Sequence, residues 1–146
     1  MLENALIIAA KAHKGQLDKG GNPYILHPIR VMLGCKTQEE KIVAILHDTL
    51  EDSDLTVDDL IKEGFSENIV DAVVCLTRDK NQDYMEHIQE VSKNSLATAV
   101  KLSDLADNMD LNRLPGLTQK DFQRLEKYLR AKLILEEALL NRPCEP

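Results

Sequence analysis

The stretch from residue 44 to residue 52 reads Ala44-Ile45-Leu46-His47-Asp48-Thr49-Leu50-Glu51-Asp52 and places metal-binding types of side chain directly after an apolar run. A histidine and an aspartate stand side by side there, and two more carboxylates follow three and four residues after Asp48. A helix normally buries such a run against its neighbours, and buried charged groups need a partner. The stretch therefore predicts a metal ion beside a helical core, with His47 and Asp48 as ligands and with Glu51 and Asp52 for acid–base chemistry.

Apolar residues recur at helical spacing along most of the chain, and nowhere do they alternate as in a β-strand. Thr37 and Glu40, and likewise Thr56 and Asp59, have the spacing of a capping box at a helix N-terminus. We therefore predict an all-α fold, a compact helical bundle that forms a single domain over residues 1–146. The predicted helices cover residues 2–14, 28–33 with Pro28 at the first position, 38–52, 57–63, 67–77, 83–93, 95–110 and 119–140.

Composition and charge exclude several classes of function. The chain has 146 residues and a net charge of −7, which argues against nucleic-acid partners. It has no apolar stretch long enough to span a bilayer and no signal-peptide pattern at its start, so we expect no membrane contact. Cys35, Cys75 and Cys144 form no close-spaced pair, which fits reduced thiols and predicts a cytoplasmic location.

A metal ion needs more ligands than His47 and Asp48, which lie about 100° apart around a helix. The best further candidates are His27, at the start of a short helix after a Gly-rich loop, and Asp104, which interrupts an apolar helix face. Two histidines and two aspartates suit Mn²⁺, Fe²⁺ or Zn²⁺. From the His-Asp dipeptide alone, a capping or surface pair is the simpler interpretation.

Glu51 and Asp52 fall four residues after His47 and Asp48, so we expect all four on one face of a helix. Carboxylates clustered beside a cation can relay protons to and from a metal-bound water. The alternative is a solvated acidic helix end, because more aspartates follow in the sequence.

Other polar residues stand in helical register with Asp104. Asn108 follows it by one turn and can position a water or a ribose hydroxyl, although an asparagine at a helix C-terminus is a serious alternative. Lys101 precedes it by one turn and can pair with an acid. Arg124 and Tyr128 suit phosphate binding and stacking, but by themselves they are best interpreted as an ordinary amphipathic helix surface.

Taken together, these segments resemble the HD-domain hydrolases. The closer resemblance is to the alarmone hydrolases: the hydrolase domain of RelA/SpoT proteins and their small stand-alone relatives, such as the metazoan SpoT homologue. It covers roughly residues 5–135 and rests on several motifs in the same order, which makes it far more specific than one His-Asp pair. The matching stretches are Ala12-His13-Lys14-Gly15-Gln16, Lys19-Gly20-Gly21-Asn22-Pro23-Tyr24, Ile25-Leu26-His27-Pro28, Leu46 to Asp52, Leu76-Thr77-Arg78 and Val100 to Asn108.

The resemblance implies a helical HD-domain bundle with one divalent ion, usually Mn²⁺, although another divalent transition metal is compatible with the ligands. The implied metal ligands are His27, His47, Asp48 and Asp104. The implied catalytic residues are Glu51, Asp52 and Asn108. The implied substrate-binding residues are Lys19, Tyr24, Asn108, Arg124 and Tyr128.

The implied activity is Mn²⁺-dependent removal of the 3′-pyrophosphate from guanosine tetra- or pentaphosphate, leaving GDP or GTP. The chain departs from the family at Asp18, where relatives often have a second basic residue, and at Gly20, where some have Ser. These departures leave open hydrolysis of another nucleotide, such as an adenosine alarmone or the 2′-phosphate of NADPH. A metal-stabilised nucleotide-binding module without turnover is a third hypothesis. The expected partner is a small-molecule nucleotide, and the oligomeric state, a homo-oligomer included, stays open.

Overall fold

The computed structural model describes residues 1–143, so Cys144 lies outside the described residues. The described chain consists of helices joined by short loops, and the all-α prediction is confirmed. The helices are α1 (Leu2–Ala12), α2 (Leu26–Leu33), α3 (Gln38–Leu46), α4 (Thr49–Asp52), α5 (Val57–Lys62), α6 (Glu67–Leu76), α7 (Tyr84–Ser92), α8 (Ser95–Asn108), the 3₁₀ helix η1 (Leu111–Arg113) and α9 (Gln119–Leu140).

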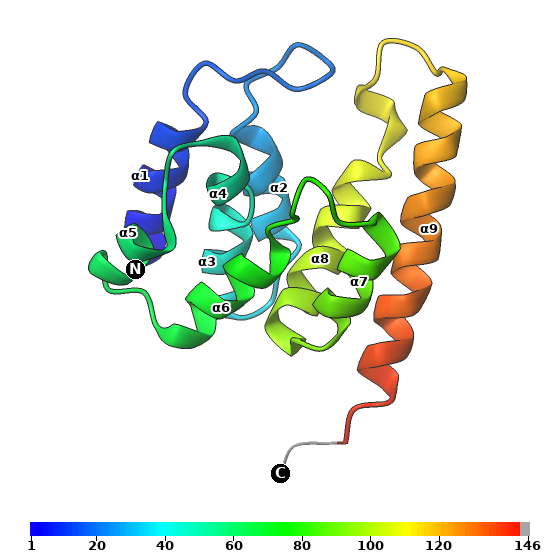
Figure 1. Ribbon diagram of the computed structural model, residues 1–146. Helices are drawn as coiled ribbons and strands as arrows, with labels where there is room; N and C mark the ends of the chain where they lie inside the picture. Colours follow the sequence, from blue (N-terminus) through cyan, green and yellow to red (C-terminus); the bar gives the residue numbers. More distant parts are fainter. Residues whose placement is uncertain (144–146) are drawn as a thin grey trace.

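Helix α3 lies at the centre of the bundle, where it packs against α1, α2, α6 and α8. Its last five residues, 42–46, are all buried, and a helix that is apolar on every side must be covered by others. Figure 1 shows α1 on one flank of the molecule and α9 on the other. Helix α9 packs against α7 and α8, and it buries Ala131 and Leu135 there.

The predicted helix starts and stops are largely confirmed. Thr37 Oγ1 accepts a hydrogen bond from the Glu40 amide at 3.1 Å, and the Glu40 carboxylate accepts one from the Thr37 amide at 3.2 Å. Such reciprocal bonds satisfy amides that lack a partner within the helix. Gly64 follows α5 with φ of 86°, a left-handed conformation that glycine adopts without strain and that ends the helix as predicted.

The prediction of one helix through residues 38–52 is wrong, because α3 ends before His47 and α4 begins after Asp48. Thr49 Oγ1 donates a hydrogen bond to the carbonyl oxygen of Leu46 at 2.7 Å. Side-chain bonds of this kind compete with the helical backbone ladder. His47 and Asp48 therefore occupy a turn between two helices, and the predicted common helix face of four residues does not exist.

Helix α2 carries His27 and lies very close to α8. It begins two residues earlier than predicted, so Pro28 occupies its third position, where the missing N–H would be unpaired in any case. A Cβ added to Gly34, just after α2, would lie 2.3 Å from Ser103 Oγ of α8. Ser103 Oγ in turn donates to the Val31 carbonyl at 2.8 Å. The absent side chain at Gly34 thus permits the approach that brings the functional residues of α2 and α8 together.

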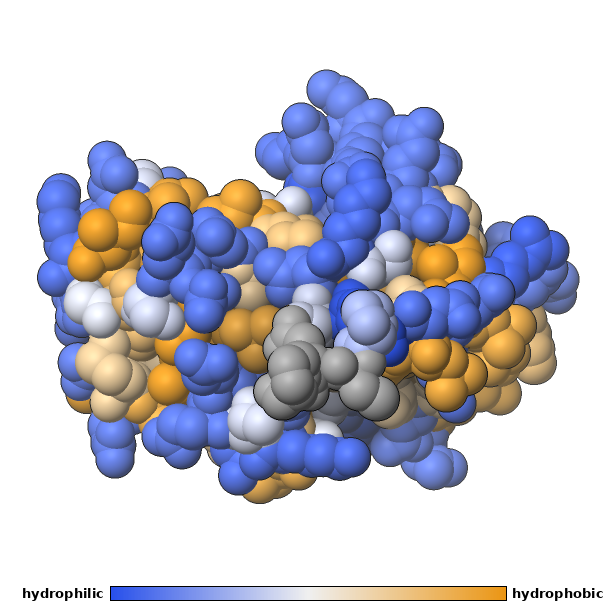
Figure 2. Space-filling model, turned by 90° about the horizontal axis from the view of Figure 1, so that it is seen from below, coloured by the Kyte–Doolittle hydropathy of each residue, from blue (hydrophilic) through white to orange (hydrophobic). Residues whose placement is uncertain are grey.

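Within residues 1–143, no helix combines the length and apolar character needed to cross a membrane. Figure 2 shows a face of the molecule on which hydrophilic side chains predominate and hydrophobic ones form separate patches. Scattered exposed apolar side chains are normal on protein surfaces. Cys35 is buried and Cys75 is half-buried, and both are free thiols.

Candidate metal centre and pocket

Three buried side chains from separate segments meet at one point between α2, α3 and α8. His27 Nε2 lies 3.0 Å from Asp104 Oδ1, and His47 Nε2 lies 3.5 Å from the same oxygen. The ligand atoms of these three residues all lie within 4.8 Å of one another. Two imidazoles and a carboxylate at this spacing are a donor set that a divalent transition metal accepts.

Asp48 adds a fourth donor atom beside this group. Its Oδ2 lies 3.0 Å from His47 Nε2 and 3.7 Å from His27 Nε2. The same oxygen accepts a hydrogen bond of 2.5 Å from the Tyr24 hydroxyl. The four residues predicted as metal ligands therefore lie together, and Tyr24 holds one of them in place.

The orientation of both histidines leaves Nε2 free for a metal. His47 Nδ1 lies 2.6 Å from the Ala44 carbonyl oxygen, so this nitrogen carries the proton in the neutral ring. His47 Nε2 is buried and has no hydrogen-bond partner. His27 Nδ1 lies 2.6 Å from Asp107 Oδ2, the carboxylate–histidine arrangement found behind many metal ligands. A buried, unpartnered nitrogen that faces two carboxylates fits a bound cation.

The electrostatics of this group also favour a cation. Burial would raise the pKa of Asp48, but the adjacent His47 imidazole, in its protonated form, and the hydrogen bond from Tyr24 lower this pKa to about 2. Burial likewise works against ionisation of Asp104, yet the Lys101 ammonium and the two adjacent imidazoles hold its pKa well below its usual value. Both carboxylates therefore stay ionised at neutral pH and need positive charge beside them.

Lys101 and Asn108 contact Asp104 from opposite turns of α8. Lys101 Nζ lies 2.7 Å from Asp104 Oδ2, and Asn108 Nδ2 donates to Asp104 Oδ1 at 3.0 Å. The predicted helical register of these three residues is thus observed as direct contact. Asn108 orients a candidate metal ligand as well as facing a cavity.

Glu51 and Asp52 lie on α4, the short helix that follows Asp48. Glu51 Oε1 accepts a hydrogen bond from the Arg78 amide, and burial together with the charges of Asp48 and Asp52 raises its pKa. Asp52 Oδ2 accepts a hydrogen bond of 3.1 Å from Gln16 Nε2. Each carboxylate is thus oriented by a partner from a distant part of the chain.

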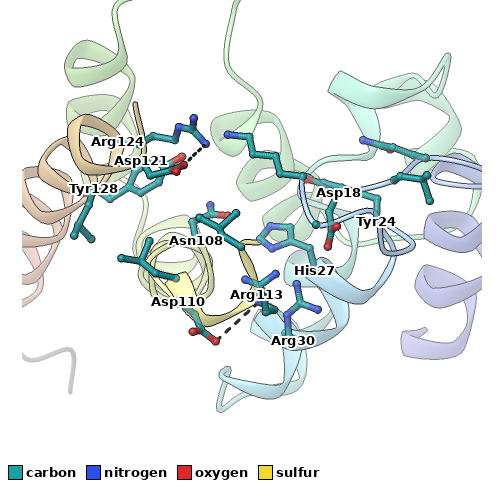
Figure 3. A pocket seen from close by; sticks show the side chains of 17 residues that line it. Asp18, Tyr24, His27, Arg30, Asn108, Asp110, Arg113, Asp121, Arg124 and Tyr128 are labelled. Atoms are coloured by element: carbon teal, nitrogen blue, oxygen red, sulfur yellow. Dashed lines mark ion pairs between the residues drawn. The ribbon is translucent and has the colours of Figure 1, made fainter. Parts of the chain in front are cut away.

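A cavity of about 390 Å³ opens beside His27, between the loop of residues 16–24 and helices α8, η1 and α9. Figure 3 shows side chains from these segments converging on it. All five residues predicted to bind substrate line its wall: Lys19, Tyr24, Asn108, Arg124 and Tyr128. Glu51 and Asp52 are absent from this lining, so the two predicted acids lie outside the cavity wall.

The two departures from the family pattern have structural roles in the cavity loop. Asp18 Oδ1 accepts a hydrogen bond from the Asn22 amide at 2.9 Å and so closes the turn. A Cβ added to Gly20 would lie 2.9 Å from the carbonyl oxygen of Arg113. A serine at position 20 would therefore push the loop away from η1, whereas glycine allows the loop to lie directly against the Arg113 carbonyl.

Two arginines of the cavity wall and the acid that binds them were not predicted. Arg30 Nε lies 2.7 Å from Asp107 Oδ1, and Arg113 Nη2 lies 3.2 Å from Asp107 Oδ2. The sequence contained a weak signal, since Asp107 follows Asp104 by three residues and so lies on nearly the same helix face. The pairing with Arg30 depends on the packing of α2 against α8, which no local pattern indicates.

Comparison with known proteins identifies the family to which the chain belongs. Residues 5–109 match the HD-domain family, which is most of the chain and includes all four candidate metal ligands. The chain belongs to this family. Its HD domain is related to the hydrolase domain of SpoT- and RelA-type proteins, as the sequence resemblance implied.

Two curated relatives and one solved structure illustrate the similarity. The HD domain is 38% identical over 120 residues to a guanosine-3′,5′-bis(diphosphate) 3′-pyrophosphohydrolase of Aquifex aeolicus, covering 74% of this chain and 17% of that protein. It is 30% identical to the bifunctional (p)ppGpp synthase/hydrolase SpoT of Escherichia coli, covering 97% of this chain and 21% of that protein. The chain thus spans about a fifth of these relatives.

The solved structure is described as a metazoan orthologue of SpoT that hydrolyses ppGpp and plays a role in starvation responses. It aligns with 99% of this chain and 96% of its own, with a TM-score of 0.72 and 24% identity. At this identity the match establishes the common fold.

Proposed function

We propose that this HD domain is a metal-dependent pyrophosphohydrolase that removes the 3′-pyrophosphate from guanosine 3′,5′-bis(diphosphate) or its pentaphosphate. The observation that carries the proposal is the position of the cavity: it contacts the metal-ligand candidate His27, and its wall contains all five residues that the family resemblance implies for substrate binding. Its volume of about 390 Å³ lies in the range of small-molecule sites.

The residues that would hold the metal are His27, His47, Asp48 and Asp104. Their donors, two imidazole nitrogens and carboxylate oxygens, suit Mn²⁺, and we expect Mn²⁺ as the working ion. A divalent ion held there would supply Lewis acidity toward a phosphoryl oxygen and make water a stronger nucleophile.

The chain's own acids handle the protons of the reaction. A water oxygen forms a new bond to the phosphorus that carries the ribose 3′-oxygen, and the bond from that phosphorus to the 3′-oxygen breaks. The products are GDP or GTP, which regains a 3′-hydroxyl, and pyrophosphate. We assign acceptance of the water proton to Glu51, whose pKa is raised, and assistance of proton transfer to the 3′-oxygen to Asp52.

The cavity residues bind and orient the nucleotide. Lys19 and Arg124 offset phosphate charge, and the Tyr128 ring offers a stacking surface to the base. The Tyr24 hydroxyl is engaged by Asp48, so this residue presents its ring to a ligand. Asn108 faces the cavity while bound to Asp104, so its amide would contact the nucleotide close to the metal ligands.

A panel of nucleotides tests the substrate assignment. Purified protein with Mn²⁺ is offered ppGpp, pppApp and NADPH in competition, and each product is separated and identified. We expect ppGpp to be consumed first. Glu51→Ala should lose turnover and keep its metal, measured by metal analysis after desalting. Preferential loss of phosphate from NADPH would replace the proposed substrate, and tight ppGpp binding without any product would indicate a binding module.

A further inference from the structure

A second group of cations lies on the other side of Asp104 from His27. Lys127 Nζ of α9 lies 4.4 Å from the centre of the Tyr84 ring and 5.4 Å from that of Tyr128. Arg78 Cζ lies 5.6 Å from the Tyr84 ring centre. Lys101 extends this group to the metal centre through its ion pair with Asp104. We call Arg78, Lys101 and Lys127, with the Tyr84 hydroxyl, the cationic cluster.

Two of these cations have no acidic partner. Among residues 1–143, no carboxylate lies within 4.0 Å of the Arg78 guanidinium or the Lys127 ammonium. The Arg78 guanidinium is held instead by the Gln82 carbonyl oxygen, which accepts from Nε at 3.1 Å and from Nη2 at 2.9 Å. Burial lowers the pKa of Lys127, and the charges of Arg78, Arg124 and Lys101 lower it further. A bound anion would relieve the repulsion between Lys127 and the neighbouring cations, most of all for Lys127, which is partly buried while Arg78 is exposed.

The Tyr84 hydroxyl supplies an independent observation. It is buried and has no hydrogen-bond partner in the described structure. Burial raises the pKa of Tyr84 to about 12, so the hydroxyl keeps its proton and remains a donor. A buried donor without an acceptor costs free energy, about 1–3 kcal/mol in typical cases. An anion bound by the cluster would give this hydroxyl an acceptor.

The cluster also lies next to the proposed chemistry. The backbone amide of Arg78 holds Glu51, and Lys101 holds Asp104. Tyr128, whose ring lies beside Lys127 of the cluster, also lines the wall of the nucleotide cavity. An anion in the cluster would therefore lie next to the metal centre and to the nucleotide cavity.

We propose that the cationic cluster binds the terminal phosphate of the 3′-diphosphate, so that the enzyme selects a diphosphate ester over a monophosphate ester at the scissile position. This inference rests on the proposed function, because it assigns a binding site to the diphosphate group that the reaction transfers to water. Lys127 and Arg78 neutralise the outer phosphate, and the Tyr84 hydroxyl donates to it. A monophosphate ester has no group to fill this position.

Cation–π packing alone does not explain the cluster. One exposed cation–π contact contributes about 0.5–1 kcal/mol, whereas here two cations lie over one ring and repel each other. A purely structural role for Lys127 would also predict equal effects on every substrate. The two explanations therefore differ in substrate selectivity, which can be measured.

The test compares ppGpp with guanosine 5′-diphosphate 3′-monophosphate, which lacks only the terminal phosphate. Lys127→Gln should lower kcat/KM for ppGpp by roughly 10- to 100-fold and leave the monophosphate ester within about 2-fold, as expected for loss of one charged contact. Lys127→Arg should restore most of the preference. Lys132→Gln, on the same helix and paired at 3.7 Å only with Glu136, is the matched control and should behave as wild type. Equal losses on both substrates, or no loss on either, would overturn the proposal.

A binding arm keeps the inference separate from the proposed function. Calorimetry on Mn²⁺-loaded protein, freed of excess metal, measures affinity for inorganic pyrophosphate and for orthophosphate. Wild type should prefer pyrophosphate, and Lys127→Gln should lose that preference. If neither nucleotide is hydrolysed but this pattern holds, the hydrolase proposal fails and the cluster assignment stands. If wild type shows no preference, the cluster assignment is wrong whatever the enzyme does.

Discussion

Asp107 Oδ2 lies 2.6 Å from Nδ1 of His27, and the same carboxylate binds Arg30. One side chain therefore orients a candidate metal ligand and ties it to the cavity wall. Asp107→Asn should weaken metal binding by about 10- to 100-fold, since an amide holds the imidazole less firmly in the required orientation. Titration of metal-stripped protein with Mn²⁺ measures this directly. Asp110→Asn, an exposed acid 3.9 Å from Arg113, is the control and should bind metal as wild type does.

Gln16 connects a buried histidine to a candidate catalytic acid. Its Oε1 lies 2.9 Å from His13 Nδ1, and its Nε2 donates to Asp52 Oδ2. Gln16→Leu should lower kcat on ppGpp by about 10-fold or more, because Asp52 loses its fixed orientation. Metal content should stay unchanged. Gln89→Leu, at an exposed position, is the comparison variant. A kcat for Gln16→Leu equal to that of Gln89→Leu would show that Gln16 does not orient Asp52 for catalysis.

The contact between Gly34 and Ser103 determines how closely α2 and α8 approach. Gly34→Ala should destabilise the fold by about 1–3 kcal/mol, because a Cβ there would lie 2.3 Å from Ser103 Oγ. Chemical denaturation measures the change. Adding Ser103→Ala removes the colliding oxygen, so the double variant should be more stable than the sum of the single changes predicts. Simple additivity would mean that the collision with Ser103 Oγ is not the source of the destabilisation.

His87 makes the stability depend on pH. Burial lowers its pKa from 6.5 to about 4, and the charges of Lys101 and Arg78 act in the same direction, opposed by Asp104. The unfolded chain therefore binds more protons between these values, and the free energy of unfolding falls as the pH falls. The contribution between pH 7 and pH 5 is about 2 kcal/mol. Denaturation of wild type and His87→Gln at both values should show a smaller pH effect in the variant.

Much of the fold follows from local patterns. The capping residues Thr37, Thr56 and Thr118 mark helix starts where the structure has them, because side chain to amide bonds form within four residues. The break after Leu46 could not be predicted from local patterns. It depends on hydrogen bonds from the side chains of His47 and Thr49 to backbone carbonyl oxygens. Helical periodicity carries no information about that competition.

Contacts of the site within one helix could likewise be predicted from the sequence, whereas contacts between helices could not. The spacing predicted that Lys101 can pair with Asp104 or another acid, and the pair with Asp104 forms because α8 is one regular helix in which residues three apart meet. Asp107 and Arg30 are separated by 77 positions, and their contact exists only because α2 packs on α8. The cationic cluster could not be predicted for the same reason, since its four members come from α7, α8, α9 and the loop between α6 and α7.

The most direct measurement is a product assay on ppGpp with metal-stripped protein, with protein refilled with Mn²⁺, and with refilled Asp48→Ala. The proposed function predicts GDP and pyrophosphate in equal amounts from the refilled wild type alone. This result would support catalytic roles for Glu51 and Asp52 and a role in turnover for the metal ligand Asp48. Absence of both products, with Mn²⁺ bound and the helical fold intact, would contradict the assignment of this HD domain as a ppGpp pyrophosphohydrolase.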